Sequence, residues 1–208
     1  MGLTIDRKPA GPFPRLAQID VDQYHKMIET GILPEGAPIE LIDGLLVYKD
    51  RSARGEDPMT VGKSHRWIVN KLMKLFEPLL RLQVVLQLQD PIRMGTVREP
   101  EPDGAILRGM PDDYKDRLPT AADVVCVMEV SDSSLAFDRE TKLNLYAEAG
   151  IPQYVIFNIP DRQIEVYEEP LAAEGRYARL AEIKAGGTVS FHIGGGKRLD
   201  VPADHFLP

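Results

Sequence analysis

The chain has 208 residues, enough for one domain with a hydrophobic core. Its composition, 43% apolar and 27% charged residues, is that of an ordinary globular protein, and no run of residues approaches the length of a membrane span. A single cysteine, Cys126, excludes an internal disulfide, and the N-terminal residues lack the pattern of a secretory signal. We therefore expect a cytoplasmic protein.

The net charge of −7 is unevenly distributed. Residues 1–50 carry −3 and residues 99–208 carry −9, whereas residues 51–98 hold 9 basic and 4 acidic side chains, a net charge of +5. The acidic total argues mildly against a nucleic-acid partner. The basic middle block is compatible either with a phosphate-facing surface or with a solvated helix face.

The first 50 residues predict a short helix and a hairpin. Residues 1–18 are rich in proline and predict an extended arm. Asp20 can cap a helix that runs through Thr30 and ends at Gly31. Residues 39–48 place Asp-Gly between two apolar runs, which is a strong hairpin signal. We expect a loop over residues 50–63.

The rest of the chain predicts a mixed sheet with two helices. From residue 64 the order is helix, three strands, helix, strand, with a crossover through the second helix and a β-rich tail. We therefore expect a mixed α/β fold (α+β, mixed sheet) and one domain over 19–208. The predicted elements are a helix from Ser64 to about Leu82 kinked near Pro78, a half-exposed strand 83–89, strands 103–108 and 123–130 around a polar loop 109–122, a helix 139–149 capped by Asp138, and strands 153–159, 163–168, 176–183 and 188–193.

Glu129 is the most informative residue in the sequence. It lies near the end of a valine-rich run that is typical of a strand buried on both faces, where an unpaired carboxylate is costly. Asp103 begins the preceding strand, so the two carboxylates can approach each other on one face of the sheet. Two carboxylates in a partly dry site repel each other unless a cation is present, and Mg²⁺ takes such oxygen ligands together with water and phosphate.

Two cations on the following helix extend this candidate site. Lys142 and, three residues before it, Arg139 are expected on the same helix face, directed toward the end of the Glu129 strand. Lys142 would then lie near the N-terminus of a helix capped by Asp138, which opposes the helix dipole and costs about 0.3–1 kcal/mol. Each residue alone also has a structural interpretation, as a strand end or a solvated helix cation. Their joint placement favours a site.

Four segments resemble a known family, and 128–154 is the most specific of them. The sequence looks like the Uma-two family, formerly a domain of unknown function, in the PD-(D/E)XK, restriction-endonuclease-like superfamily. The likeness covers about residues 20–168. The segments are IELIDG (39–44), EPD (101–103), MEVSDSSL (128–135) and DRETKLNLYAEAGIPQY (138–154).

The resemblance implies a restriction-endonuclease-like core in which Asp103 and Glu129 are metal ligands. The superfamily's usual lysine lies two residues after the glutamate, where this chain has Ser131, and the resemblance transfers the lysine role to Lys142. Glu40 also matches a recurrent position and would assist at the metal site; its alternative is a paired strand residue. His65 and Arg139 would contact the substrate phosphate or water. The alternative interpretation of His65 is a surface histidine.

The leading hypothesis is an endonuclease that uses Mg²⁺ or Mn²⁺ to hydrolyse DNA phosphodiesters. Asp103 and Glu129 would bind the metal, Lys142 would orient the attacking water, and Glu40 would assist. One alternative is an inactive member of the fold that serves as a DNA-binding or protein-interaction module. Another is a metal-dependent phosphohydrolase that acts on a small substrate. The sequence leaves open whether the β-rich tail extends the sheet or forms a homodimer contact.

Overall fold

The computed structural model describes residues 16–49 and 62–207, which form two compact units. The first unit contains residues 16–49 and 93–100, and the second contains 62–92 and 101–207. Most of the expected N-terminal arm and of the loop 50–63 lies outside the described residues. The expectation of a single domain stays a prediction. Within the described ranges, no helix has the length and apolar character needed to cross a bilayer.

The first unit confirms the predicted helix and hairpin. Helix α1 (Val21–Glu29) begins at Asp20, whose carboxylate accepts from the Gln23 amide while the Gln23 side chain accepts from the Asp20 amide. Strands β1 (Ile39–Ile42) and β2 (Leu45–Tyr48) pair in an antiparallel manner. Both residues of the connecting Asp43-Gly44 turn have positive φ, as a tight hairpin requires.

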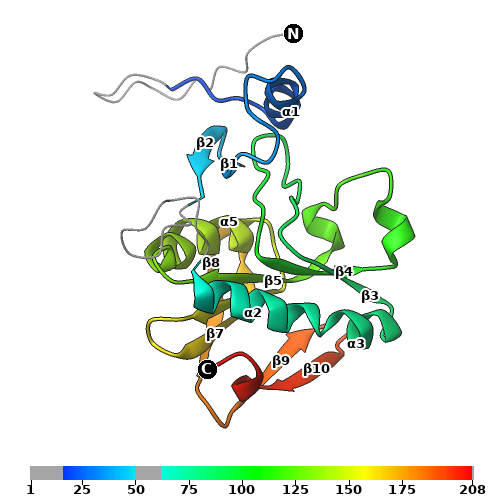
Figure 1. Cartoon of the computed structure of the whole chain (residues 1–208), viewed down its shortest axis with the longest axis vertical. Helices are drawn as coiled ribbons and strands as arrows, with labels where there is room; N and C mark the ends of the chain where they lie inside the picture. Colours follow the sequence, from blue (N-terminus) through cyan, green and yellow to red (C-terminus); the bar gives the residue numbers. More distant parts are fainter. Residues whose placement is uncertain (1–15, 50–61, 208) are drawn as a thin grey trace. The chain divides into compact units, whose positions relative to one another are not determined.

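The second unit is built on a six-stranded mixed sheet, which confirms the expected fold class (Figure 1). The spatial order of the strands is their chain order, and only β5 and β6 pair in parallel. The tail therefore extends the sheet through β7 and β8. The strands are β3 (Val84–Gln87), β4 (Gly104–Arg108), β5 (Val124–Ser131), β6 (Gln153–Asn158), β7 (Gln163–Leu171) and β8 (Arg176–Ile183).

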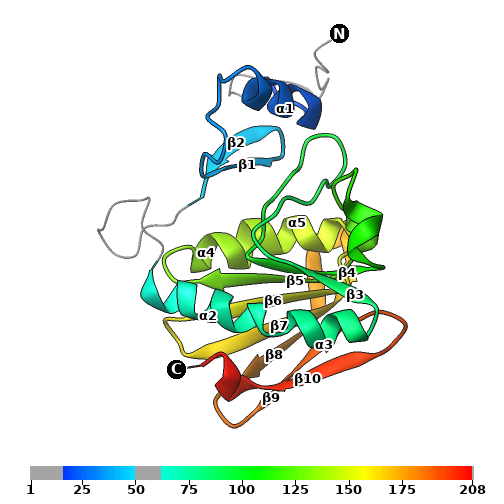
Figure 2. The same cartoon turned by 45° about the vertical axis from the view of Figure 1, so that its right-hand side comes forward.

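One face of the sheet is covered by two helices and a hairpin (Figure 2). The expected helix 64–82 is broken into α2 (Lys63–Met73) and α3 (Phe76–Arg81), and its N-cap is Gly62 rather than Ser64. The hairpin comprises β9 (Thr188–His192) and β10 (Arg198–Pro202). Strand β10 was not predicted, and β3 is largely buried rather than half-exposed because this layer covers it.

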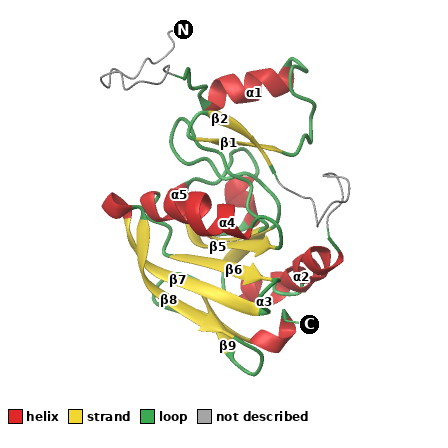
Figure 3. Cartoon of the chain, turned by 90° about the vertical axis from the view of Figure 1, so that its left-hand side faces the viewer, coloured by secondary structure: helices red, strands yellow, loops and turns green. Residues whose placement is uncertain are grey.

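The opposite face is covered by one continuous helical segment, seen above β5–β8 in Figure 3. It consists of α4 (Leu135–Phe137), a π-helical turn η3 (Asp138–Lys142) and α5 (Leu143–Glu148). The prediction that Asp138 caps this helix is wrong, because Asp138 lies inside it and is 3% exposed. Short 3₁₀ turns occur at Pro111–Tyr114, Ala121–Asp123, Ala172–Glu174 and Ala203–His205.

The C-terminal residues belong to the core of the second unit. Phe206 is fully buried, and its ring centroid lies 4.9 Å from that of Phe157 and 5.9 Å from that of Phe191. We expect Phe206→Ala to lower the free energy of unfolding by about 3–5 kcal/mol, because it removes buried area and leaves a cavity. Denaturant titration measures this. The control is Leu180→Ala, at a side chain that is 53% exposed. This substitution should change the free energy of unfolding by less than about 0.5 kcal/mol.

Candidate functional site

The pairing of β4 with β5 brings Asp103 and Glu129 together. Gly104 pairs with Met128, so Asp103, one residue before β4, lies opposite Glu129. The Asp103 amide nitrogen is 3.4 Å from Glu129 Oε2, and the Val130 amide donates to Asp103 Oδ2 at 2.9 Å. Asp103 and Glu129 thus approach each other on adjacent strands, as their positions in the sequence predict.

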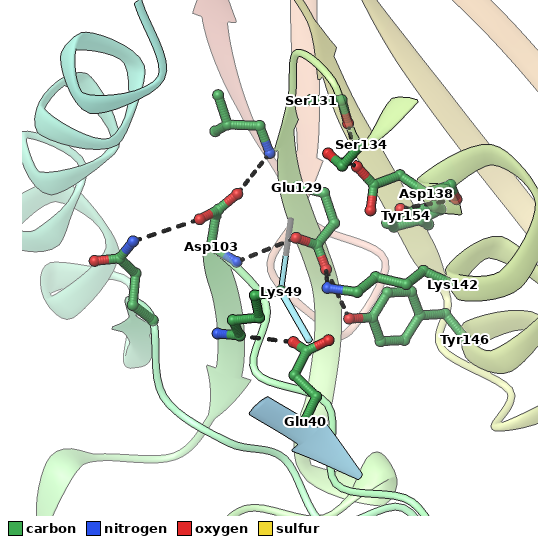
Figure 4. Close-up of polar contacts among 12 residues, drawn as sticks. Glu40, Lys49, Asp103, Glu129, Ser131, Ser134, Asp138, Lys142, Tyr146 and Tyr154 are labelled. Carbon is green, nitrogen blue, oxygen red and sulfur yellow. Dashed lines mark hydrogen bonds and ion pairs between the residues drawn. The ribbon is translucent and has the colours of Figure 1, made fainter. Parts of the chain in front are cut away.

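Glu129 is buried and is bound by two donors from the helical segment (Figure 4). Lys142 Nζ and the Tyr146 hydroxyl both donate to Glu129 Oε1, at 2.8 and 2.9 Å. Tyr146 follows Lys142 by four residues, so both side chains leave the same helix face. The four-residue spacing is visible in the sequence and is the signal that would have identified Tyr146 as a site residue.

His65 contacts the other carboxylate. His65 Nε2, from the first turn of α2, lies 3.0 Å from Asp103 Oδ2. Its side chain is 19% exposed, so it is neither a fully exposed surface histidine nor a buried one. Among the described residues, His65 Nδ1 is one of the few buried side-chain atoms without a hydrogen-bond partner. The geometry therefore places His65 beside a candidate metal ligand.

Arg139 does not join Lys142. Its guanidinium donates to both carboxylate oxygens of Glu165, at 3.1 and 2.5 Å, and lies 3.5 Å from Asp161. The expectation that the helix directs both cations to the end of the Glu129 strand is therefore wrong. The expected dipole cost is also wrong, because the helical segment begins at Leu135, two turns before Lys142.

Glu40 belongs to the first unit, where it lies on β1. Its carboxylate is 2% exposed and lies 3.7 Å from Lys49 Nζ. This agrees with the interpretation of Glu40 as a paired strand residue. Its role at the metal site stays a prediction.

Asp103 is held as a carboxylate by its surroundings. Burial raises its pKa, but the hydrogen bond and charge of His65, the Val130 amide and the charge of Lys142 together outweigh burial, and the pKa lies below its ordinary value of 3.8. Asp138 behaves in the opposite way. Burial raises its pKa above the ordinary value, although Lys142 and two serine hydroxyls oppose that rise. The two acids therefore differ in their readiness to ionise.

Asp103 and Glu129 supply carboxylate oxygens, the type of ligand that Mg²⁺ and Mn²⁺ prefer. In the described part of the chain, no group of three or more His, Cys, Asp or Glu side chains is arranged to hold a metal by itself. Within the described residues, Asp103 Oδ1 has a long contact, 3.5 Å to Gln89 Nε2. Mg²⁺ commonly takes one or two carboxylates plus water and substrate phosphate, so these residues fit it.

Comparisons with known proteins agree with this fold. A crystal structure described as a "putative nuclease belonging to DUF820" from Anabaena variabilis ATCC 29413 aligns with a TM-score of 0.65 and 15% identity, over 90% of this chain and 97% of that one. No curated protein matches the chain. The model of the Uma2 family, described as "Putative restriction endonuclease", matches residues 21–191. This match spans most of the sequence, and the chain therefore belongs to the Uma2 family.

Proposed function

We propose that the protein is a metal-dependent nuclease that hydrolyses DNA phosphodiester bonds. The observation that carries this proposal is the convergence of Asp103, Glu129 and Lys142 from β4, β5 and the helical segment. Two carboxylates beside a lysine suit the binding of a cation and of a negatively charged phosphodiester. The description of the Uma2 family supports the same reaction class.

Asp103 and Glu129 would hold Mg²⁺ or Mn²⁺ through their carboxylates. A bound divalent cation polarises a phosphoryl oxygen and lowers the pKa of a coordinated water. Because Asp103 has a lowered pKa, its carboxylate is ionised and ready to bind a cation at neutral pH. His65 keeps that carboxylate oriented through its Nε2 contact.

Lys142 would orient the attacking water and stabilise the charge that develops on the phosphate. Its ammonium donates to Glu129 Oε1 at 2.8 Å, so it lies beside the candidate metal ligand. Tyr146 fixes the same carboxylate oxygen from one turn further along the helix. His65, beside Asp103, would contact a phosphate or its water.

Cleavage assays on DNA test the proposal. With Mg²⁺ or Mn²⁺ present, we expect the wild type to cleave, and Glu129→Gln and Lys142→Ala each to lose about 100-fold or more in rate, the usual cost of removing a charge-stabilising group. Lys197→Ala, at an exposed turn residue, is the control and should cleave like the wild type. Equal rates in all four proteins would contradict the assignment. Single-stranded, double-stranded and supercoiled DNA should all be tried.

Metal binding is tested by thermal stability. A cation that binds only the folded protein stabilises it by about 2.7 kcal/mol at 100 times its dissociation constant. We expect Mn²⁺ to raise the melting temperature of the wild type and of Asp112→Asn, an exposed control, but not that of Glu129→Gln. A wild type that is folded yet shows no shift and no cleavage would instead indicate a non-catalytic module.

The stability contributed by Asp103 should depend on pH. Its folded-state pKa lies below the ordinary value of 3.8, so its contribution is present above that value and is lost as pH falls through the folded pKa. Without metal, Asp103→Asn should lower the free energy of unfolding by about 1.5–3 kcal/mol at pH 7, because it weakens hydrogen bonds to a charged group. The difference from the wild type should shrink below about pH 4.

The matched control for this titration is Asp116→Asn. Its side chain is 85% exposed, so its stability difference from the wild type should be small at every pH. Urea titrations at several pH values measure both variants. A stability loss at Asp103 that stays constant from pH 7 to acid would refute a role for its charge.

A further inference from the structure

Ser131 occupies the strand position that carries a lysine in the superfamily pattern. It contacts the helical segment that carries Lys142. Ser131 and Glu129 lie two residues apart on β5 and share one face of the sheet. Ser131 is fully buried, and its hydroxyl donates to Asp138 Oδ2 at 2.6 Å. Asp138 is the first residue of the π-helical turn η3, and Lys142 is the last. Figure 4 shows this contact beside Glu129.

Asp138 has several partners but no part in the chemistry described above. Its carboxylate Oδ2 also accepts from Ser134 Oγ at 2.7 Å. A buried carboxyl group is costly unless hydrogen bonds satisfy it, and here two hydroxyls converge on one oxygen. Two of these three residues, Ser134 and Asp138, belong to the start of the helical segment, and Ser131 belongs to the strand beneath it. The cluster therefore joins the helix to β5 next to Glu129.

A fourth residue binds the turn from a different strand. The backbone oxygen of Asp138 accepts from the Leu143 amide, five residues later, which defines the π-helical turn. The Tyr154 hydroxyl, from β6, donates to the same oxygen at 3.1 Å. A π-helical turn holds one residue more than an α-helical turn, so it changes the direction in which the side chain of residue 142 leaves the helix.

We propose that Ser131, Ser134, Asp138 and Tyr154 form a positioning network that fixes this turn and thereby places Lys142 Nζ against Glu129. The importance of this placement rests on the proposed function, in which Lys142 acts on the substrate. The serine that replaces the strand lysine thus holds the turn that supplies a lysine from the helix. None of the four is a catalytic residue, because each acts through Lys142.

Two tyrosines provide a matched test. Tyr154 and Tyr177 are buried in the same aromatic cluster, with ring centroids 6.4 Å apart, and each donates to one backbone oxygen. The acceptor of Tyr177 is Ile151, outside the π-helical turn. Tyr154→Phe and Tyr177→Phe therefore each remove one buried hydroxyl, and only the first removes a contact with the turn.

The readout is the acetylation rate of Lys142 in the folded protein, measured by peptide mass spectrometry. Lys26, whose side chain is 73% exposed, is the internal reference. We expect Tyr154→Phe to acetylate at Lys142 about fivefold faster than the wild type, the effect of losing one hydrogen bond that keeps the turn closed. Tyr177→Phe should match the wild type at Lys142, although both variants melt at similarly lowered temperatures. Equal rates in the two variants would overturn the proposal.

Substitutions at Asp138 and Ser131 provide a second test. Asp138→Asn keeps an oxygen that accepts from both serines, so Lys142 should stay as protected as in the wild type. Asp138→Ala and Ser131→Ala should increase the labelling of Lys142. If Asp138→Ala does not fold, Ser131→Ala alone decides, and wild-type protection of Lys142 in that variant would count against the network.

Cleavage by the same proteins separates this proposal from the proposed function. If the wild type cleaves DNA, Tyr154→Phe should lower kcat with little change in KM, whereas Tyr177→Phe should not. Faster labelling of Lys142 in Tyr154→Phe, in a protein that never cleaves, would support the network and refute the nuclease. Cleavage by the wild type with identical labelling of both variants would refute the network alone.

Discussion

The ion pair between Lys142 and Glu129 is the interaction on which the rest of the candidate site depends. Both side chains are nearly buried, 7% and 5% exposed, and their charged atoms lie 2.8 Å apart. A buried charge that loses its partner costs about 3–5 kcal/mol, so each residue stabilises the burial of the other. The helical segment must therefore pack on the face of β5 that presents Glu129, at the height where Lys142 and Tyr146 reach it. The pairing of these two buried charges thus favours the observed position of the helix on the sheet.

The register of β5 decides which residues meet that helix. Glu129 and Ser131 face it, whereas Cys126, Met128 and Val130 face the apolar layer of α2, α3 and the β9–β10 hairpin. A slip of one residue would exchange the two faces and place Glu129 in that apolar layer. The register irregularity between Ile106 and Leu107 lies at the far end of β4, and the pairing of Gly104 with Met128 beside the site is regular.

The sequence was most informative where local patterns determine structure. The Asp43-Gly44 turn, the broken helix near Pro78 and the approach of Asp103 to Glu129 follow from turn chemistry, helix breakers and the adjacency of sequential strands. The sequence predicts a cap at Asp138 because an acid before a helical pattern usually caps the helix. In the structure the helical segment starts at Leu135, and Asp138 lies inside it. The direction of Arg139 does not follow from the local sequence, because its partner Glu165 lies 26 residues away on β7.

Two kinds of contact hold the helical segment, and they determine different things. The Tyr146 ring packs against Tyr154 of β6, a contact that holds the helix on the sheet but tolerates small rotations. Tyr154 in turn stacks with Tyr167 and Tyr177 of β7 and β8. Hydrogen bonds are directional and weaken steeply when misaligned, so the contacts at Asp138 restrict how the turn is rotated. A lysine on β5 itself would need neither the aromatic packing nor these hydrogen bonds, because the same strand would carry both the lysine and Glu129. In the network proposed above, a lysine supplied from a helix is positioned by polar contacts with the sheet, among them the contact between the buried Ser131 and Asp138.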